Sequence, residues 1–166
     1  MNNYPQKLLV LFCALIITSC SSNEAEIADS TPEMSTSINE KSIEADVLDL
    51  INSYRVNNGF SSLNKLQTIK SQTNNHTNYM IEKEEISHDF FHQRKEYLTE
   101  NANAIKVGEN VAYGYSTAEA VVDAWIKSNG HKENIEGDYT HFEITAEKSD
   151  NGKWYYTNIF VKKIVK

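Results

Sequence analysis

The sequence of 166 residues predicts an α+β fold in which the helices precede the strands. Two observations support this prediction. Apolar residues recur at helical spacing through the middle of the chain, and strand-like segments flank a hairpin signal, Asp150-Asn151-Gly152, near its end. Helices followed by a hairpin favour an α+β arrangement over a parallel sheet.

Four helices are expected. The first three cover about residues 40–57, 66–84 and 92–101, and the second has only a sparse apolar face. The fourth is the clearest, because a capping box headed by Ser116 precedes an apolar stripe. Gly130 is expected to end this helix.

Strands are expected on either side of the last helix. Residues 107–113 form one candidate, in which Gly108 is expected to let the backbone turn tightly. Residues 141–148 alternate apolar with polar side chains, and residues 153–164 are rich in aromatic and β-branched types. The last two segments are expected to pair as a hairpin.

The first 19 residues have the layout of a secretory signal. Lys7 precedes the apolar run 8–17, and small residues follow it up to Cys20. The run is too short to span a bilayer as a mature helix. A buried core helix is the alternative, but no amphipathic pattern surrounds it. The segment ITSC also resembles the lipobox of bacterial lipoproteins, which implies that Cys20 carries the lipid.

Residues 20–42 are rich in Ser, Thr and Glu and predict a disordered tether, so that one domain covers residues 43–166. Cys13 lies in the signal, so the mature chain has no cysteine pair for an internal disulfide. The formal net charge is −7, and loss of residues 1–19, with Lys7 as their one charge, lowers it by one to −8. Such an acidic chain argues against nucleic-acid binding.

Three separated polar residues are the best candidates for a site. His88 and His131 each follow an expected helix end, and Glu109 stands at the entry to an apolar segment. If they converge, two imidazoles and a carboxylate can bind a divalent ion and leave a coordination position open. The alternative is a buried polar network in which the carboxylate holds the histidines.

The other histidines are interpreted as structural or solvent-facing. His76 lies on the apolar face of the second helix and is interpreted as a packing residue, and His92 and His141 are expected to be exposed. The chain has no HExxH, CxxC, GxSxG or P-loop pattern, so these motif-based enzyme classes lose support.

Four segments occur in a set order along the chain. They are LINSYRVNNGFSSL, HTNYM, GENVAYGYSTAEAVVDAW followed by SNGHKENI, and NGKWYYTNIF. Together they resemble the CAP superfamily, also called SCP/TAPS, in its bacterial branch. The resemblance covers about residues 45–161, and the GEN block followed by Trp and Gly-His is its most specific part.

This resemblance implies a three-layer α-β-α sandwich around a three-stranded antiparallel sheet. It also implies a central cavity to which His88, Glu109 and His131 contribute, and in some relatives the two histidines hold a divalent metal ion. The chain departs from better-studied eukaryotic relatives at Ser128, where those have a second cavity glutamate. The eukaryotic disulfides are also missing.

Three functions follow as hypotheses. The preferred one is a lipid-anchored binding module, in which His88 and His131, with Glu109 as an optional third group, bind Zn²⁺, another divalent cation or a small ligand. The second is a structural or interaction lipoprotein with a polar core. The third is a metal-assisted hydrolase. All three place the protein in the cell envelope outside the cytoplasm, anchored by Cys20 to a membrane, the outer one in a Gram-negative bacterium.

Overall fold

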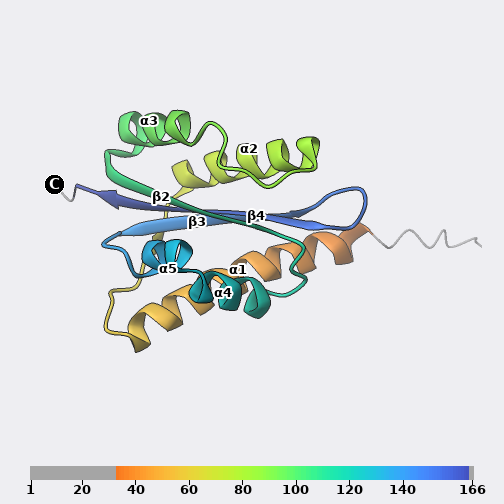
Figure 1. Cartoon of the computed structure of the whole chain (residues 1–166), viewed down its shortest axis with the longest axis horizontal. Coiled ribbons are helices and arrows are strands. Elements are labelled where there is room, and N and C mark those ends of the chain that lie inside the picture. The colour runs from red at the N-terminus through yellow and green to blue at the C-terminus, as the bar shows by residue number, and fades with distance from the viewer. Residues whose placement is uncertain (1–32, 165–166) are drawn as a thin grey trace, which may run out of the picture. The chain divides into compact units, whose positions relative to one another are not determined.

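The computed structural model describes residues 33–164, with side chains from Ile43 onward. Five helices and four strands make up this part of the chain (Figure 1). In chain order they are α1 (Glu33–Asn57), β1 (Asn64–Lys65), α2 (Gln67–Lys83), α3 (Phe91–Ala102), β2 (Ala104–Tyr113), α4 (Ala118–Lys127), α5 (Asn129–Glu136), β3 (His141–Lys148) and β4 (Trp154–Lys163).

The sheet lies between two helical layers. Helices α2 and α3 cover one face, and α1, α4 and α5 cover the other (Figure 1). The strand order is β1-β3-β4-β2, and β3, β4 and β2 are antiparallel neighbours. This confirms the predicted α+β sandwich with an antiparallel hairpin, and it leaves β2 at one edge of the sheet.

The fourth strand was not predicted. β1 has two residues and runs parallel to β3. The Asn52 side chain holds the chain there, because its amide donates to the Leu63 carbonyl at 3.0 Å and accepts from the Leu63 N–H at 2.8 Å. A two-residue strand has no sequence periodicity of its own, so only tertiary contacts define it: its pairing with β3 and the Asn52 side chain.

Two different kinds of packing hold the helical layers to the sheet. On the α1 side a large apolar cluster includes Phe142, Phe160 and Trp125. On the α2 side threonines join helix to sheet, with Thr73 and Thr145 hydroxyls 2.7 Å apart. Buried hydroxyls that satisfy one another can pack without cost, which explains why α2 has few apolar residues and is still a core helix.

Two helix boundaries differ from the predictions. The cap of α4 is Thr117, whose Oγ1 accepts the Ala120 N–H at 3.2 Å, and Ser116 does not cap it. The helix ends at Lys127, because Ser128 adopts an extended conformation with ψ of 118°. Gly130 therefore lies inside a separate helix, α5, instead of ending α4.

Helix α1 begins earlier than expected. It starts at Glu33, so it includes residues 33–42, which were predicted to belong to the tether. No proline or glycine occurs between Pro32 and Gly59, so no residue in this stretch breaks a helix. The predicted signal segment and Cys20 lie outside the described residues. Among the described helices, none is long and apolar enough to cross a membrane.

Gly108 serves close packing and does not make a turn. It lies within β2, opposite Phe160 of β4. A Cβ atom at this position would stand 2.5 Å from Asn134 Oδ1 and 2.5 Å from the Tyr139 hydroxyl. The strand can approach α5 only because residue 108 has no side chain.

Two glycine variants are expected to change stability in opposite directions. Gly108→Ala should lower the free energy of unfolding by about 1–3 kcal/mol, because the added methyl overlaps Asn134 and Tyr139. Gly130→Ala should raise it by up to about 1 kcal/mol, because the methyl meets open space on a helix. Urea denaturation of both variants measures this. Equal effects would contradict the packing role of Gly108.

Candidate functional site at the sheet edge

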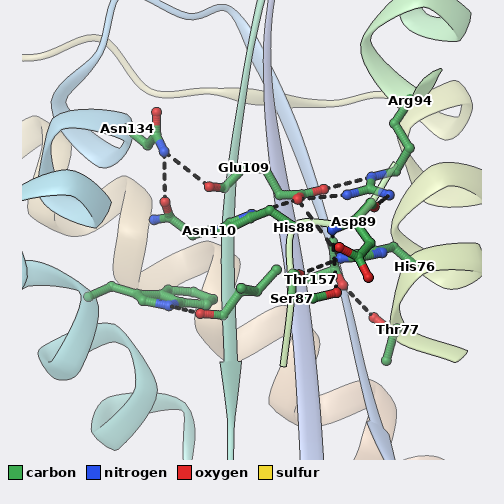
Figure 2. Close-up of polar contacts among 12 residues, drawn as sticks. His76, Thr77, Ser87, His88, Asp89, Arg94, Glu109, Asn110, Asn134 and Thr157 are labelled. Carbon is green, nitrogen blue, oxygen red and sulfur yellow. Dashed lines mark hydrogen bonds and ion pairs between the residues drawn. The ribbon is translucent and has the colours of Figure 1, made fainter. Parts of the chain in front are cut away.

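Glu109 is the centre of the site. Strand β2 directs its side chain toward the α2/α3 layer, where the side chain is 1% exposed. Arg94 of α3 meets it in a bidentate pair, with Nε donating to Oε2 at 2.8 Å and Nη2 donating to Oε1 at 2.8 Å (Figure 2). Burial of a carboxylate is costly unless a charged partner and hydrogen bonds compensate it, and Arg94 provides both for Glu109.

Arg94 was not among the predicted site residues. It is buried in α3 on the same face as Leu98 and Ala102, four and eight residues further on. Its Nη1 also donates to the Asp89 carbonyl at 2.7 Å. The sequence did contain a signal for this role, because Arg94 stands at helical spacing from the apolar residues of α3. A basic residue on the buried face of a helix needs an acidic partner.

His88 binds the outer side of the same carboxylate. Its Nδ1 lies 2.8 Å from Glu109 Oε1, and its side chain is 52% exposed. The carboxylate is ionised and only accepts, so Nδ1 carries a proton. In the neutral ring Nε2 then keeps its lone pair, ready to bind a metal ion or accept a proton.

His76 also belongs to the site, although its position suggested packing alone. Nε2 of the buried ring lies 2.8 Å from the Ser87 carbonyl and 3.9 Å from Glu109 Oε1. Burial lowers the pKa of His76, against the opposing effect of Glu109, so the ring is held toward its neutral form. The ring helps to fix the loop that carries His88.

Glu109 remains ionised despite its burial. Burial raises its pKa, but the hydrogen bonds from His88 and Arg94 and the Arg94 charge lower it more, so the net shift is below the usual value. Both of its oxygens are occupied by these donors. The carboxylate therefore orients His88, and its possible role as a metal ligand stays a prediction.

His131 approaches the edge of the sheet from the opposite helical layer. The Asn110 side chain donates to its carbonyl at 3.0 Å, and Asn134 binds both Asn110 Oδ1 and the Glu109 carbonyl (Figure 2). The His131 ring is tilted against Trp125 with ring centres 6.5 Å apart. These contacts place α5 beside the Glu109 backbone.

His88 and His131 are electrostatically close. Burial lowers the pKa of His131, and the neighbouring His88 lowers it further, so both effects favour the neutral ring. His88 thus contacts Glu109 directly, as predicted, whereas the convergence of the His131 ring with them stays a prediction. His92 is exposed as expected, with an 82% exposed side chain, and His141 is partly buried.

A small apolar cleft adjoins His131. It has a volume of about 250 Å³, and most of its walls are apolar side chains of β2, α4 and the loop before α3. Its lining includes Ile86, Tyr113, Tyr115, Trp125 and Ser128. Ser128, where eukaryotic relatives have a second glutamate, thus contributes a small neutral side chain to this cleft.

The side chains at the sheet edge do not form a complete set of metal ligands among the described residues. Within residues 43–164, no three His, Cys, Asp or Glu side chains are arranged to hold a metal ion. A metal ion at this edge would take the His88 and His131 imidazoles as ligands, and water or a bound molecule would have to complete its coordination. Two imidazoles suit Zn²⁺ and other borderline ions better than Ca²⁺ or Mg²⁺.

Residues 48–161 match the CAP family model, described as the cysteine-rich secretory protein family. The chain belongs to the CAP family. Two curated relatives from Bacillus subtilis agree with this. The CAP chain is 32% identical over 124 residues to the uncharacterized membrane protein YlbC, covering 72% of this chain and 34% of that protein. It is 30% identical over 146 residues to the uncharacterized protein YkwD, and the match covers 84% of this chain and 54% of that protein.

The CAP chain therefore spans between a third and about half the length of these relatives. Solved structures share its fold. An extracellular protein containing an SCP domain from Bacillus anthracis has a TM-score of 0.67 at 21% identity, covering 82% of this chain and 45% of that one. An outer surface protein from Borrelia burgdorferi has a TM-score of 0.64 at 20% identity, and the match covers 71% of this chain and 90% of that one.

Removal of Arg94 should be strongly destabilising. Arg94→Leu leaves Glu109 as a buried charge without its main partner, which should cost about 3–5 kcal/mol in the free energy of unfolding. The matched double variant Arg94→Leu/Glu109→Met removes both charges and should lose much less. Urea denaturation measures both. A double variant as unstable as the single one would contradict this account.

Stability should fall as the pH drops below about 6.5, the ordinary pKa of histidine. Burial lowers the folded-state pKa of His76 and His131, so the unfolded chain binds protons that the folded chain does not. Each of these histidines lowers the free energy of unfolding by at most about 1.4 kcal/mol for each pH unit of acidification. In urea denaturation at pH 7, 6 and 5, His76→Gln should flatten this decline. Parallel profiles for variant and wild type would show that His76 is not its source.

Proposed function

We propose that this CAP protein is a lipid-anchored, extracytoplasmic binding module whose sheet-edge site uses His88 and His131 to bind a divalent cation such as Zn²⁺, or a small ligand. The observation that carries the proposal is the half-exposed His88 ring, whose Nδ1 is hydrogen-bonded to a buried carboxylate. Such a ring has a fixed tautomer and a free lone pair, which is the usual arrangement of a metal-binding histidine.

The charges around the histidines support this function. The Arg94–Glu109 pair is locally neutral, and the lowered pKa of His131 keeps that ring available as a donor at neutral pH. Binding a divalent ion requires unprotonated imidazoles. When bound, the ion would supply a Lewis-acid centre, and Glu109 would act by holding the His88 ring in place.

The cleft beside His131 supports an organic ligand at the same site. Ile86, Tyr113 and Tyr115 are all partly exposed at this face, with fractional exposures of 37%, 48% and 37%. Exposed apolar side chains around a small cleft are typical of a ligand pocket. A ligand with one apolar or aromatic group and one metal-binding or hydrogen-bonding group fits these walls.

The anchor and location rest on the sequence. The signal-like segment and Cys20 support export followed by lipidation, and the acidic charge leaves the acyl chains as the means of membrane attachment. The names of the similar proteins refer to outer surface, extracellular and membrane locations. We place the protein in the cell envelope, on the outer membrane if the source is Gram-negative.

A hydrolase is the second candidate, because a carboxylate-bound histidine is also the arrangement of a general base. His88 could accept a proton from water through Nε2, with Glu109 stabilising the charged ring. In a hydrolase screen on the full-length protein, activity lost in His88→Ala and retained in His92→Ala would support it. Full activity in Glu109→Gln would remove it.

Zinc titration by calorimetry tests the preferred function. The full-length wild-type protein should bind one Zn²⁺, and His88→Ala or His131→Ala should each weaken binding at least tenfold. Glu109→Gln should weaken it about 10–100-fold, because the amide holds the imidazole less firmly. His92→Ala is the matched control on an exposed histidine and should bind as the wild type does.

The result also separates the binding module from a structural lipoprotein. If Zn²⁺ and the cleft play no part, Glu109→Gln and His131→Ala will lower the melting temperature while all zinc isotherms remain alike. That outcome would favour the structural function, in which the cluster only fixes the fold. Identical isotherms together with wild-type melting curves would reject both accounts.

A further inference from the structure

A second cavity lies between α2 and α3, on the outer helical layer. It has a volume of about 390 Å³, and it shares no wall residue with the cleft beside His131. Besides His76 and Arg94, its walls are aromatic rings and neutral amides: Gln72, Asn75, Tyr79, Phe90, Gln93 and Tyr97. The sheet-edge function uses none of these six side chains.

The aromatic residues of this cavity are exposed, and packing of the fold does not account for their position. Phe90 is 55% exposed and Tyr97 is 39% exposed. The Phe90 ring meets the Tyr79 ring edge to face, with centres 5.3 Å apart. Phe90 also has a left-handed backbone, with φ of 59°, which is costly for a bulky side chain. A strained and exposed phenylalanine contributes little to the core, so it points to binding.

The amides of this wall are available to a ligand. Asn75 and Gln93 form no side-chain hydrogen bond with the described part of the chain. Gln72 has only a long contact, 3.4 Å, from its Nε2 to Ser71 Oγ. Each planar amide can donate and accept at once, which matches a hydroxyl group or another amide.

His76 adds an unsatisfied acceptor to the cavity lining. Its Nε2 must donate to the Ser87 carbonyl, which only accepts, so in the neutral ring Nδ1 holds a lone pair. That Nδ1 is buried and has no hydrogen-bond partner among the described residues. A buried acceptor without a partner is costly, so a ligand donor that gains access to it on binding would stabilise the complex.

We propose that the α2/α3 cavity is a binding site for a neutral oligosaccharide. Sugar rings present C–H groups that pack on the negative faces of aromatic rings, and their hydroxyls match neutral amides. The charge of Arg94, the cationic residue of the lining, is already balanced by Glu109, so the cavity has little net positive charge for an anionic ligand. A proline-rich peptide has fewer hydrogen-bond donors than a saccharide has hydroxyl groups, so it would match the neutral amides less well.

The proposal is tested by titrating the full-length protein with chitotriose and with maltotriose. Ligand-detected NMR measures the binding. We expect saturable binding of at least one of them. Phe90→Asn should weaken it at least tenfold, because it removes the ring while asparagine tolerates the left-handed backbone. The melting temperature of this variant should not fall. Gln93→Ala should weaken binding about fivefold or more.

Lys95→Ala is the matched control, since it changes an exposed residue of the same helix, two positions from Gln93 and outside the cavity lining. It should bind as the wild type does. His131→Ala should also keep saccharide binding, so the two sites can fail independently. Lack of binding to both trisaccharides, or equal binding by wild type, Phe90→Asn and Gln93→Ala, would overturn the proposal.

Discussion

The buried pair of Arg94 and Glu109 is the interaction on which the site depends. It ties α3 to the edge strand β2 through two 2.8 Å hydrogen bonds, and it keeps a nearly inaccessible carboxylate ionised. The ionised carboxylate then fixes the proton on His88 Nδ1. One ion pair thus sets the position of a helix and the tautomer of an exposed histidine.

Strand alternation explains how one short segment serves both helical layers. Glu109 and Asn110 are adjacent, so their side chains leave opposite faces of the sheet. Glu109 meets Arg94 and His88, while Asn110 holds the backbone of His131. The outer edge of β2 is covered as well, because Asn134 binds the Glu109 carbonyl and Trp125 binds the Val111 carbonyl. Adjacent residues of β2 therefore hold His88 by its ring on one face of the sheet and His131 by its backbone on the other.

Local patterns in the sequence predicted four of the five helices and the hairpin, because helical periodicity and turn signals are local. The association of His88 with Glu109 came from the resemblance to the CAP family, because it joins residues far apart in the sequence. The roles of Arg94 and His76 were missed, since they arise only where α2 and α3 meet β2 across long sequence separations. Gly108 was misread for the same reason. Glycine is required at position 108 because Asn134 and Tyr139 leave no room for a side chain. The backbone conformation of the strand does not itself require glycine there.

Ser128 bears on what the proposed metal site would prefer. Glu109 has both oxygens engaged, and its charge is balanced by Arg94. Position 128 supplies no second carboxylate. A divalent ion held by two neutral imidazoles would therefore keep most of its charge uncompensated by the protein. Since a partly buried charge needs a counter-charge, such a site would favour a ligand whose anionic group completes the coordination while its apolar part occupies the cleft beside His131.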